Sequence, residues 1–400
     1  MGRWASYFYL VHYLKNRYNK SNWKESSLLT DKKGDAAVNL KKVFLLILAI
    51  PLLLLAWYSL STHPGTASAP AAVGTETEAA EPTPTPEPTP EPTPEPTPEP
   101  TPRPLNPAAL NFNYIAPELY APIEQKGSLT SLEYETKDYH YGSEGPYAKR
   151  MVVYLPYGYN ESERYNVLFL LHTSGVNENF WLSGALPYEQ FSLNMTDLLD
   201  NMIARGLIEP TIVVAPCGYI TDTAWQVHDS VRDYDQFGHE FANEILPLVV
   251  ESFSTWAEGS SRAQIAAARE HFGVAGASFG SYMTRNSVLA PNLDLVANFA
   301  MIGGGSLRQG DLPNEWSAAG LSPADYPIHR LYIVEGELDD RLEPERSYHA
   351  LTEWTDIFNA DNLRYDVIGT ATHDAREWVN GVFNAAQLFF RDDIPAEVQP

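Results

Sequence analysis

Short apolar runs alternate with longer amphipathic stretches from about residue 129 onwards. Helical patterns lie between most of these runs, for example at 234–253 and 345–359. Pro247 is expected to kink or break the first of these two helices. Strand–helix alternation of this kind predicts an α/β fold, a mostly parallel sheet with helices on both faces. The runs with the pattern of strands are residues 151–155, 167–171, 211–215, 272–275, 331–334 and 365–368.

A longer apolar run lies near the N-terminus. Residues 43–60 are almost free of polar groups and are long enough to cross a bilayer as a helix. Lys41 and Lys42 precede this run, whereas no Lys or Arg follows it until Arg103. The positive-inside rule therefore places the basic segment 1–42 in the cytoplasm. We expect a single-pass signal-anchor helix in the cell membrane, with the rest of the chain outside the cell.

A cleaved signal peptide is the alternative for the N-terminal region, because Ala67-Ser68-Ala69 has the small residues of a cleavage site. The basic segment 1–42 is unusually long for a signal peptide, which favours the uncleaved anchor. Residues 61–104 are rich in Pro, Thr and Glu and cannot bury a core, so they predict an extended linker of about 3 Å per residue. The remainder, 105–400, has the length of one α/β domain.

Charge and cysteine content narrow the possible partners. The formal net charge is −24 although the N-terminal segment is basic, so nucleic acid is not an expected partner of the acidic domain. Cys217 is the only cysteine, which excludes an intrachain disulfide. An aromatic content of 12% supports a sizeable core. Nothing in the sequence predicts the oligomeric state.

The segment Gly276-Ala277-Ser278-Phe279-Gly280 follows a predicted strand and precedes a stretch, 281–289, that can be helical. In a nucleophile elbow, flanking glycines allow a turn so sharp that the serine hydroxyl stands clear of the sheet and the next N–H faces the substrate. Ser278 is therefore the candidate nucleophile. The alternative is an ordinary strand-to-helix turn, and the order of the residues that follow argues against it.

A carboxylate and then a histidine follow later strands, as this chemistry requires. Asp339 lies just beyond the run 331–334 and is the candidate acid, with Asp340 as a competitor and a pair of solvated loop acids as the alternative. His373 follows the run 365–368 and is the candidate general base, a task suited to a side chain with a pKa near neutrality.

The turn after the run 167–171 supplies the remaining candidate group. His172-Thr173-Ser174-Gly175 leaves that buried strand, and a turn there can aim a backbone N–H at a carbonyl oxygen. The N–H groups of Ser174 and Phe279 together form a candidate oxyanion hole, in which one donor is typically worth about 3 kcal/mol. The alternative is a plain turn at the end of a strand.

These segments, in this order, resemble the carbohydrate esterase family 1 and esterase D group of α/β-hydrolases, which includes feruloyl and acetylxylan esterases. The resemblance extends from about Leu129 to Phe390. It rests on Arg150 to Tyr159 ("LPxGY"), Val167 to Trp181 ("LLHGxGxxENxW"), Glu244 to Glu251 ("ELIPYIE"), Gly276 to Ser281 ("GLSMGG"), Gly336 to Asp339 ("GTxD") and Gly369 to Asp374 ("GGGHD").

Some positions depart from the family's motifs. Thr173 stands where the family usually has glycine, and a Cβ there could alter the oxyanion loop. Phe279 replaces a methionine and Ser281 replaces a glycine, changes that need not affect the chemistry. Glu337 and Leu338 do not match the usual residues before the acid.

The resemblance implies a triad of Ser278, His373 and Asp339, no metal and no cofactor. It also implies a serine esterase that removes feruloyl or acetyl groups from plant cell-wall polysaccharide, so the expected substrate is an acylated carbohydrate or a small ester. Alternatives are a cell-surface acyltransferase similar to the mycolyltransferases and a catalytically silent carbohydrate-binding module. The candidates for substrate binding are His172 and the aromatic residues Trp181, Tyr188, Tyr219 and Trp225.

Overall fold

The structure of the protein is a computed structural model, and it describes residues 112–139, 145–184, 186–188, 191–219, 236–305, 311–340 and 343–391. All of these residues belong to one compact unit, Thr93–Pro400. The expected membrane helix, the segment before it, the linker and Trp225 lie outside the described residues. Within the described ranges, no helix has the length and apolar character needed to cross a membrane.

The described part of the chain contains an eight-stranded sheet in the order β1-β2-β6-β3-β7-β8-β9-β10. The first two pairings are antiparallel, and every pairing from β6 to β10 is parallel. The prediction of a mostly parallel sheet is confirmed. Its strands are Ser128–Thr136 (β1), Tyr147–Leu155 (β2), Asn166–Leu171 (β3), Thr211–Pro216 (β6), Phe272–Ala277 (β7), Asn298–Ile302 (β8), Arg330–Gly336 (β9) and Leu363–Ile368 (β10).

Every predicted strand is present, and the sequence pattern missed two strands of this sheet. The edge strand β1 carries mostly exposed residues over its first half, so it has no apolar run to recognise. The strand β8 is short and begins at the buried polar residue Asn298, whose side-chain amide donates to the carbonyls of Glu270 and Phe272. A small hairpin of Leu186–Tyr188 (β4) and Phe191–Leu193 (β5) was also not predicted.

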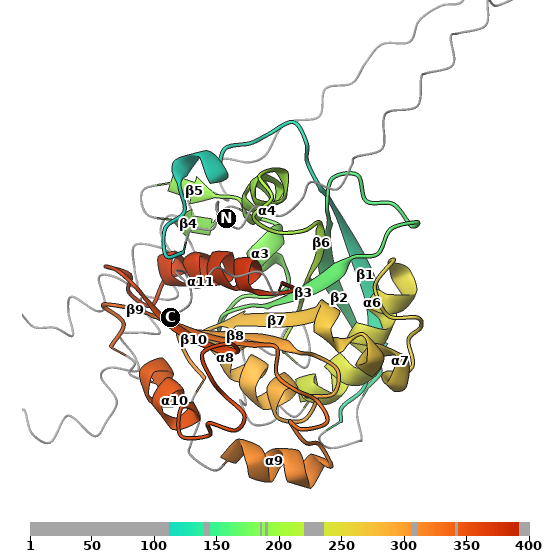
Figure 1. The fold of residues 1–400 in the computed structure, drawn as a ribbon. Helices are drawn as coiled ribbons and strands as arrows, with labels where there is room; N and C mark the ends of the chain where they lie inside the picture. Colours follow the sequence, from blue (N-terminus) through green and yellow to red (C-terminus); the bar gives the residue numbers. More distant parts are fainter. Residues whose placement is uncertain are drawn as a thin grey trace, which may run out of the picture. The chain divides into compact units, whose positions relative to one another are not determined.

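Helices cover both faces of the sheet (Figure 1), as predicted. One apolar cluster joins a face of the sheet to α3, α4 and α11, and a second cluster joins the opposite face to α6 to α10. The helices are Asn179–Leu182 (α3), Met195–Ala204 (α4), Leu246–Ser252 (α6), Arg262–Ala267 (α7), Phe279–Met283 (α8), Asp311–Ala319 (α9), Glu343–Leu351 (α10) and Ala375–Leu388 (α11), with shorter turns at Pro117–Leu119 and Arg269–His271.

Two helical predictions differ from the structure in detail. The helix is not broken at Pro247, because residues 236–252 are helical without interruption; a π-helical turn, Phe241–Ile245, leads directly into α6, and the proline lies in the first turn of α6. The prediction of a helix over 345–359 is wrong in its length, since α10 ends at Leu351. Turns follow instead, and the side-chain amide of Asn362 donates to the carbonyl of Ile357 and stabilises them.

Candidate active site

The turns that carry the candidate residues leave the carboxyl ends of β3, β7, β9 and β10. These strands run parallel, so their carboxyl ends lie at one edge of the sheet, where open α/β sheets bind ligands. Residues nearly two hundred positions apart in the sequence therefore meet at that edge.

Ser278 lies in a strained turn between β7 and α8. Its φ of 53° and ψ of −112° are rare for a residue with a side chain, and such a conformation costs about 1–3 kcal/mol. The flanking glycines are required by close backbone contacts. A Cβ on Gly276 would lie 2.0 Å from the carbonyl oxygen of Gly280, and one on Gly280 would lie 2.4 Å from that of Leu171.

A chain of hydrogen bonds joins the three side chains expected to act together. The Nε2 atom of His373 lies 2.8 Å from Oγ of Ser278, and its Nδ1 atom lies 2.7 Å from Oδ2 of Asp339. The side chain of Asp339 is fully buried, whereas that of His373 is 18% exposed. Asp340, the competing acid, is exposed to solvent, so the structure brings Asp339 to the histidine.

Backbone hydrogen bonds fix the loop of the acid against the loop of the histidine. The N–H of Glu337 donates to the carbonyl of Ile368, and the N–H of Leu338 donates to that of Ala371. The side chain of Glu337 accepts from the N–H of Thr370, which has a positive φ of 58°. The Glu-Leu pair that departs from the family's motif therefore connects the two loops.

The arrangement fits proton transfer from a serine. With Nδ1 of His373 donating to the carboxylate of Asp339, the neutral ring leaves its Nε2 lone pair to accept from Oγ of Ser278. Asp339 can stabilise the imidazolium that forms when the ring takes that proton. The geometry can therefore generate a serine nucleophile.

The predicted oxyanion turn lies beside the elbow, because the start of α8 contacts the carbonyls that end β3. Ser174 is exposed in this turn. Phe279 is the first residue of α8, and the N–H groups of a first helical turn point out of the helix. Gly175 has a φ of 83°, a left-handed backbone conformation that favours glycine at this position of the turn.

Thr173 does not have a positive φ, so the departure from glycine does not require backbone strain at that position.

His172 supports this turn from inside the protein. It is buried, and its Nε2 atom accepts from the N–H of Gly218 at 2.9 Å, so Nδ1 carries the proton and donates to the carbonyl of Thr173. Burial lowers the pKa of His172 to about 4, and the ring is therefore neutral near pH 7. With both ring nitrogens bonded to the backbone, His172 positions the turn, contrary to the prediction that it binds substrate.

The segment after β6 also holds the turn in place. The hydroxyl of Tyr219 accepts from the N–H of Gly175 at 2.7 Å, and its ring stacks on that of Phe279 with centroids 5.2 Å apart. The ammonium group of Lys149 donates to the carbonyl of Tyr219 and forms a buried ion pair with Glu240. No local sequence pattern indicates this support, because its members are far apart in the chain.

The expectation that Trp181 and Tyr219 form substrate platforms is wrong. Both side chains are about 1% exposed or less, and Trp181 lies in the apolar cluster between the sheet and α3, α4 and α11. Trp378 is half-buried and in ring contact with His373, with the centroids 5.5 Å apart. The side chain of Tyr188 and the whole of Trp225 lie outside the described residues.

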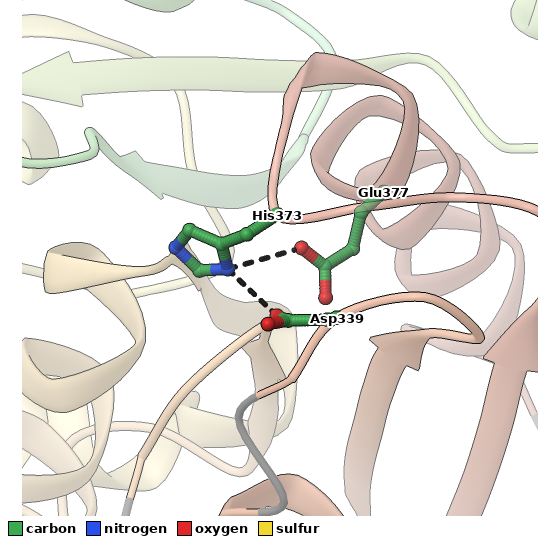
Figure 2. Close-up of side chains that lie close together, drawn as sticks. All are labelled: Asp339, His373 and Glu377. Atoms are coloured by element: carbon green, nitrogen blue, oxygen red, sulfur yellow. Dashed lines mark hydrogen bonds and ion pairs between the residues drawn. The ribbon is translucent and has the colours of Figure 1, made fainter. Parts of the chain in front are cut away.

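A second carboxylate lies beside His373. Figure 2 shows Glu377, on α11, and Asp339 approaching Nδ1 of the ring from different sides. In the described part of the chain, Asp339, His373 and Glu377 are the one group whose ligand atoms lie close enough, within 4.8 Å, to hold a metal ion. The hydrogen bond between Asp339 and Nδ1 already explains the approach of two of these residues.

No protein-family model matches the chain. Among curated proteins, it is 29% identical over 290 residues to endo-1,4-beta-xylanase Y of Acetivibrio thermocellus. This match covers 69% of this chain and 24% of that protein. It is 34% identical over 119 residues to an endo-1,4-beta-xylanase/feruloyl esterase of Xylanibacter ruminicola, covering 28% of this chain and 15% of that protein. The chain thus spans a quarter or less of the length of these relatives.

Solved structures match over more of their length. The feruloyl esterase module of Clostridium thermocellum, complexed with sinapinate, is 25% identical, with a TM-score of 0.58, and the match covers 71% of this chain and 95% of that one. A ferulic acid esterase of Anaeromyces mucronatus is 17% identical, with a TM-score of 0.52, and shares the fold over 70% of this chain and 98% of that one. The chain accordingly has an α/β-hydrolase-like fold and is similar to feruloyl esterases, which are serine carboxylic-ester hydrolases.

Proposed function

We propose that this chain is a membrane-tethered extracellular serine esterase that hydrolyses feruloyl or acetyl esters on plant cell-wall polysaccharide. The hydrogen-bonded series Ser278–His373–Asp339 carries the proposal, because it pairs a serine with a base and an orienting acid at the ligand-binding edge of the sheet. The names of the relatives support the substrate class, since one is a xylanase and the other combines xylanase and feruloyl esterase.

In the proposed acylation step, Oγ of Ser278 attacks the ester carbonyl carbon while His373 Nε2 takes the hydroxyl proton. The N–H groups of Ser174 and Phe279 donate to the oxyanion of the tetrahedral intermediate, and Asp339 stabilises the imidazolium. When the intermediate collapses, the sugar oxygen leaves with the proton from Nε2, and an acyl-enzyme ester remains on the serine.

Deacylation repeats these steps with water in place of the serine hydroxyl. His373 accepts a proton from the water, whose oxygen attacks the acyl carbon, and then returns the proton to Oγ of Ser278 as the carboxylic acid leaves. No step needs a metal or a cofactor.

The proposed location rests on the sequence. The apolar run 43–60 would anchor the chain in the membrane, with 1–42 in the cytoplasm. The Pro-rich linker 61–104 would then hold the domain 105–400 tens of ångströms from the bilayer. Protease protection of intact cells tests this arrangement, since an exposed hydrolase domain is degraded from outside and a cytoplasmic one is not.

Two assays test the function. One measures the release of p-nitrophenol from p-nitrophenyl acetate, and the other measures the release of ferulate from a feruloylated oligosaccharide. Ser278→Ala should remove turnover and labelling by a fluorophosphonate, whereas Ser260→Ala, which changes a serine beside Glu251, should keep both. Turnover unchanged in Ser278→Ala would refute the mechanism. Folded wild type that binds carbohydrate without labelling would indicate a silent module, and acyl transfer to an added sugar in preference to water would indicate an acyltransferase.

A further inference from the structure

Glu377 is a buried carboxylate with no role in the mechanism above. Its side chain is 0% exposed, one oxygen accepts from the N–H of Gly336 at 2.9 Å, and the other lies 3.4 Å from Nδ1 of His373. Asp339 takes the short hydrogen bond to the same nitrogen. Figure 2 shows both carboxylates directed at one ring atom.

Helix capping does not explain this position. Asp374 is the N-cap of α11, and a glutamate three residues later usually accepts from the N-cap N–H. In this helix the N–H of Asp374 donates to the carbonyl of Thr372, and Glu377 reaches away from the cap to the N–H of Gly336 in β9. The carboxylate is therefore directed at the site.

The neighbouring backbone is shaped to admit the carboxylate. Gly303, at the end of β8, has a φ of 58°, and a Cβ on it would lie 2.6 Å from one oxygen of Glu377 and 2.7 Å from the other. Any larger residue in that place would displace the carboxylate from the histidine.

The charges around Glu377 come from three elements. Asp339 lies on the loop after β9, His373 lies on the loop before α11, and Glu377 itself lies on α11. Burial raises the pKa of Glu377, while the histidine and the N–H of Gly336 favour its ionised form. The N-terminus of α11 favours the anion as well, because a helix N-terminus carries a partial positive charge.

We propose that Glu377 is a second carboxylate partner of His373, a positioning residue that orients the ring through Nδ1, stabilises the imidazolium together with Asp339, and replaces Asp339 in part when that side chain is removed. This inference rests on the proposed function, in which His373 accepts the proton of Ser278. A second negative charge at 3.4 Å makes the protonated ring more stable, so neutral Glu377 leaves a less basic histidine.

The first test compares the pH dependence of kcat/KM in wild type and in Glu377→Gln, using the full chain in mild detergent. The Gln side chain keeps an acceptor for Gly336 and loses the charge. The acid limb, which reports the neutral histidine, should move to lower pH by about one unit. Glu377→Asp should move it less, and Glu353→Gln, which neutralises an exposed carboxylate, should leave it in place. An unmoved limb in both Glu377 variants would overturn the inference.

The second test measures rescue. Asp339→Ala should lose about 10²-fold in kcat if Glu377 still orients Nδ1, and the double variant Asp339→Ala/Glu377→Gln should lose about 10⁴-fold, the loss typical of a triad without its acid. Equal activity of the single and double variants would contradict a shared role.

The inference can fail separately from the proposed function. Titration of His373 by NMR needs no turnover, with its signal assigned through His373→Gln. Wild type without Ser278-dependent activity would refute the function, whereas the histidine pKa should still fall in Glu377→Gln. Full activity with an unchanged histidine pKa would refute the inference and leave the function in place.

Discussion

Replacing Lys149 by methionine tests how the protein supports the candidate oxyanion turn from within. The Lys149 side chain is 1% exposed, and its ammonium nitrogen lies 2.5 Å from Oε1 of Glu240, which is fully buried. The same nitrogen donates to the carbonyls of Cys217 and Tyr219, at 3.0 Å and 2.6 Å. Methionine fills a similar volume and removes the charge and all three donors.

The expected loss is large because the partner charge stays buried. Without the ammonium group, Glu240 keeps the hydroxyl of Tyr134, which donates at 2.5 Å, and loses its counter-charge. Breaking a buried pair on one side typically costs about 3–5 kcal/mol. The double variant Lys149→Met/Glu240→Gln removes the uncompensated charge as well, so it should recover about 2 kcal/mol of that loss.

Urea denaturation followed by tryptophan fluorescence measures both free energies of unfolding, with the slope compared to confirm a two-state transition. Turnover in the folded Lys149→Met variant should also fall, since Tyr219 loses the donor that holds its carbonyl. A single variant within about 1 kcal/mol of wild type, or a double variant less stable than the single one, would refute the argument.

Other predictions concern the turns around the site. Gly276→Ala should lower the free energy of unfolding by about 3 kcal/mol, measured by denaturation, because its Cβ would lie 2.0 Å from the backbone oxygen of Gly280. Tyr219→Phe should reduce kcat about tenfold and stability by less than about 1 kcal/mol, because Gly175 is exposed and water can replace the lost acceptor. His172 contributes stability that is complete above its unfolded pKa of 6.5 and is lost as the pH falls towards 4, since burial depresses its folded pKa. Between pH 7 and pH 4, this group should lower the free energy of unfolding of wild type by about 3 kcal/mol. Denaturation at the two pH values should show a smaller fall in His172→Gln, which has no group that titrates at this position.

The sequence predicted the candidate triad because each residue follows a strand that its own neighbours define. Residues 272–275, 331–334 and 365–368 read as strands, and the carboxyl ends of parallel strands share one edge of the sheet. The relative place of Ser278, Asp339 and His373 therefore followed from local pattern and from the parallel topology.

The supporting residues could not be predicted in the same way. Tyr219 meets Gly175, and Lys149 meets Glu240, through contacts between distant segments that no local pattern encodes. The error at Trp181 has a related cause, since a position just after the candidate oxyanion turn does not determine whether a side chain faces the site or the core. One signal was available for Glu377, which lies only four residues after His373, in the first turn of the helix that follows the histidine.

Glu377 also links stability to the proposed chemistry. Burial raises its pKa above the ordinary value of 4.5, so the folded protein binds a proton more readily than the unfolded chain. The contribution of this group to stability is complete below pH 4.5 and is lost as the pH rises through the folded pKa. Glu377→Gln should therefore unfold at higher urea concentration than wild type at pH 8 and at about the same concentration at pH 4.

The stability of this variant and the pH dependence of its kcat/KM are informative together. If the variant is more stable at pH 8 and its acid limb moves, then the ionised carboxylate destabilises the fold while it acts on the histidine, as expected at functional sites. Equal stability of variant and wild type at both pH values would show that ionised Glu377 does not destabilise the fold. It would refute the proposed link between stability and the chemistry of the histidine.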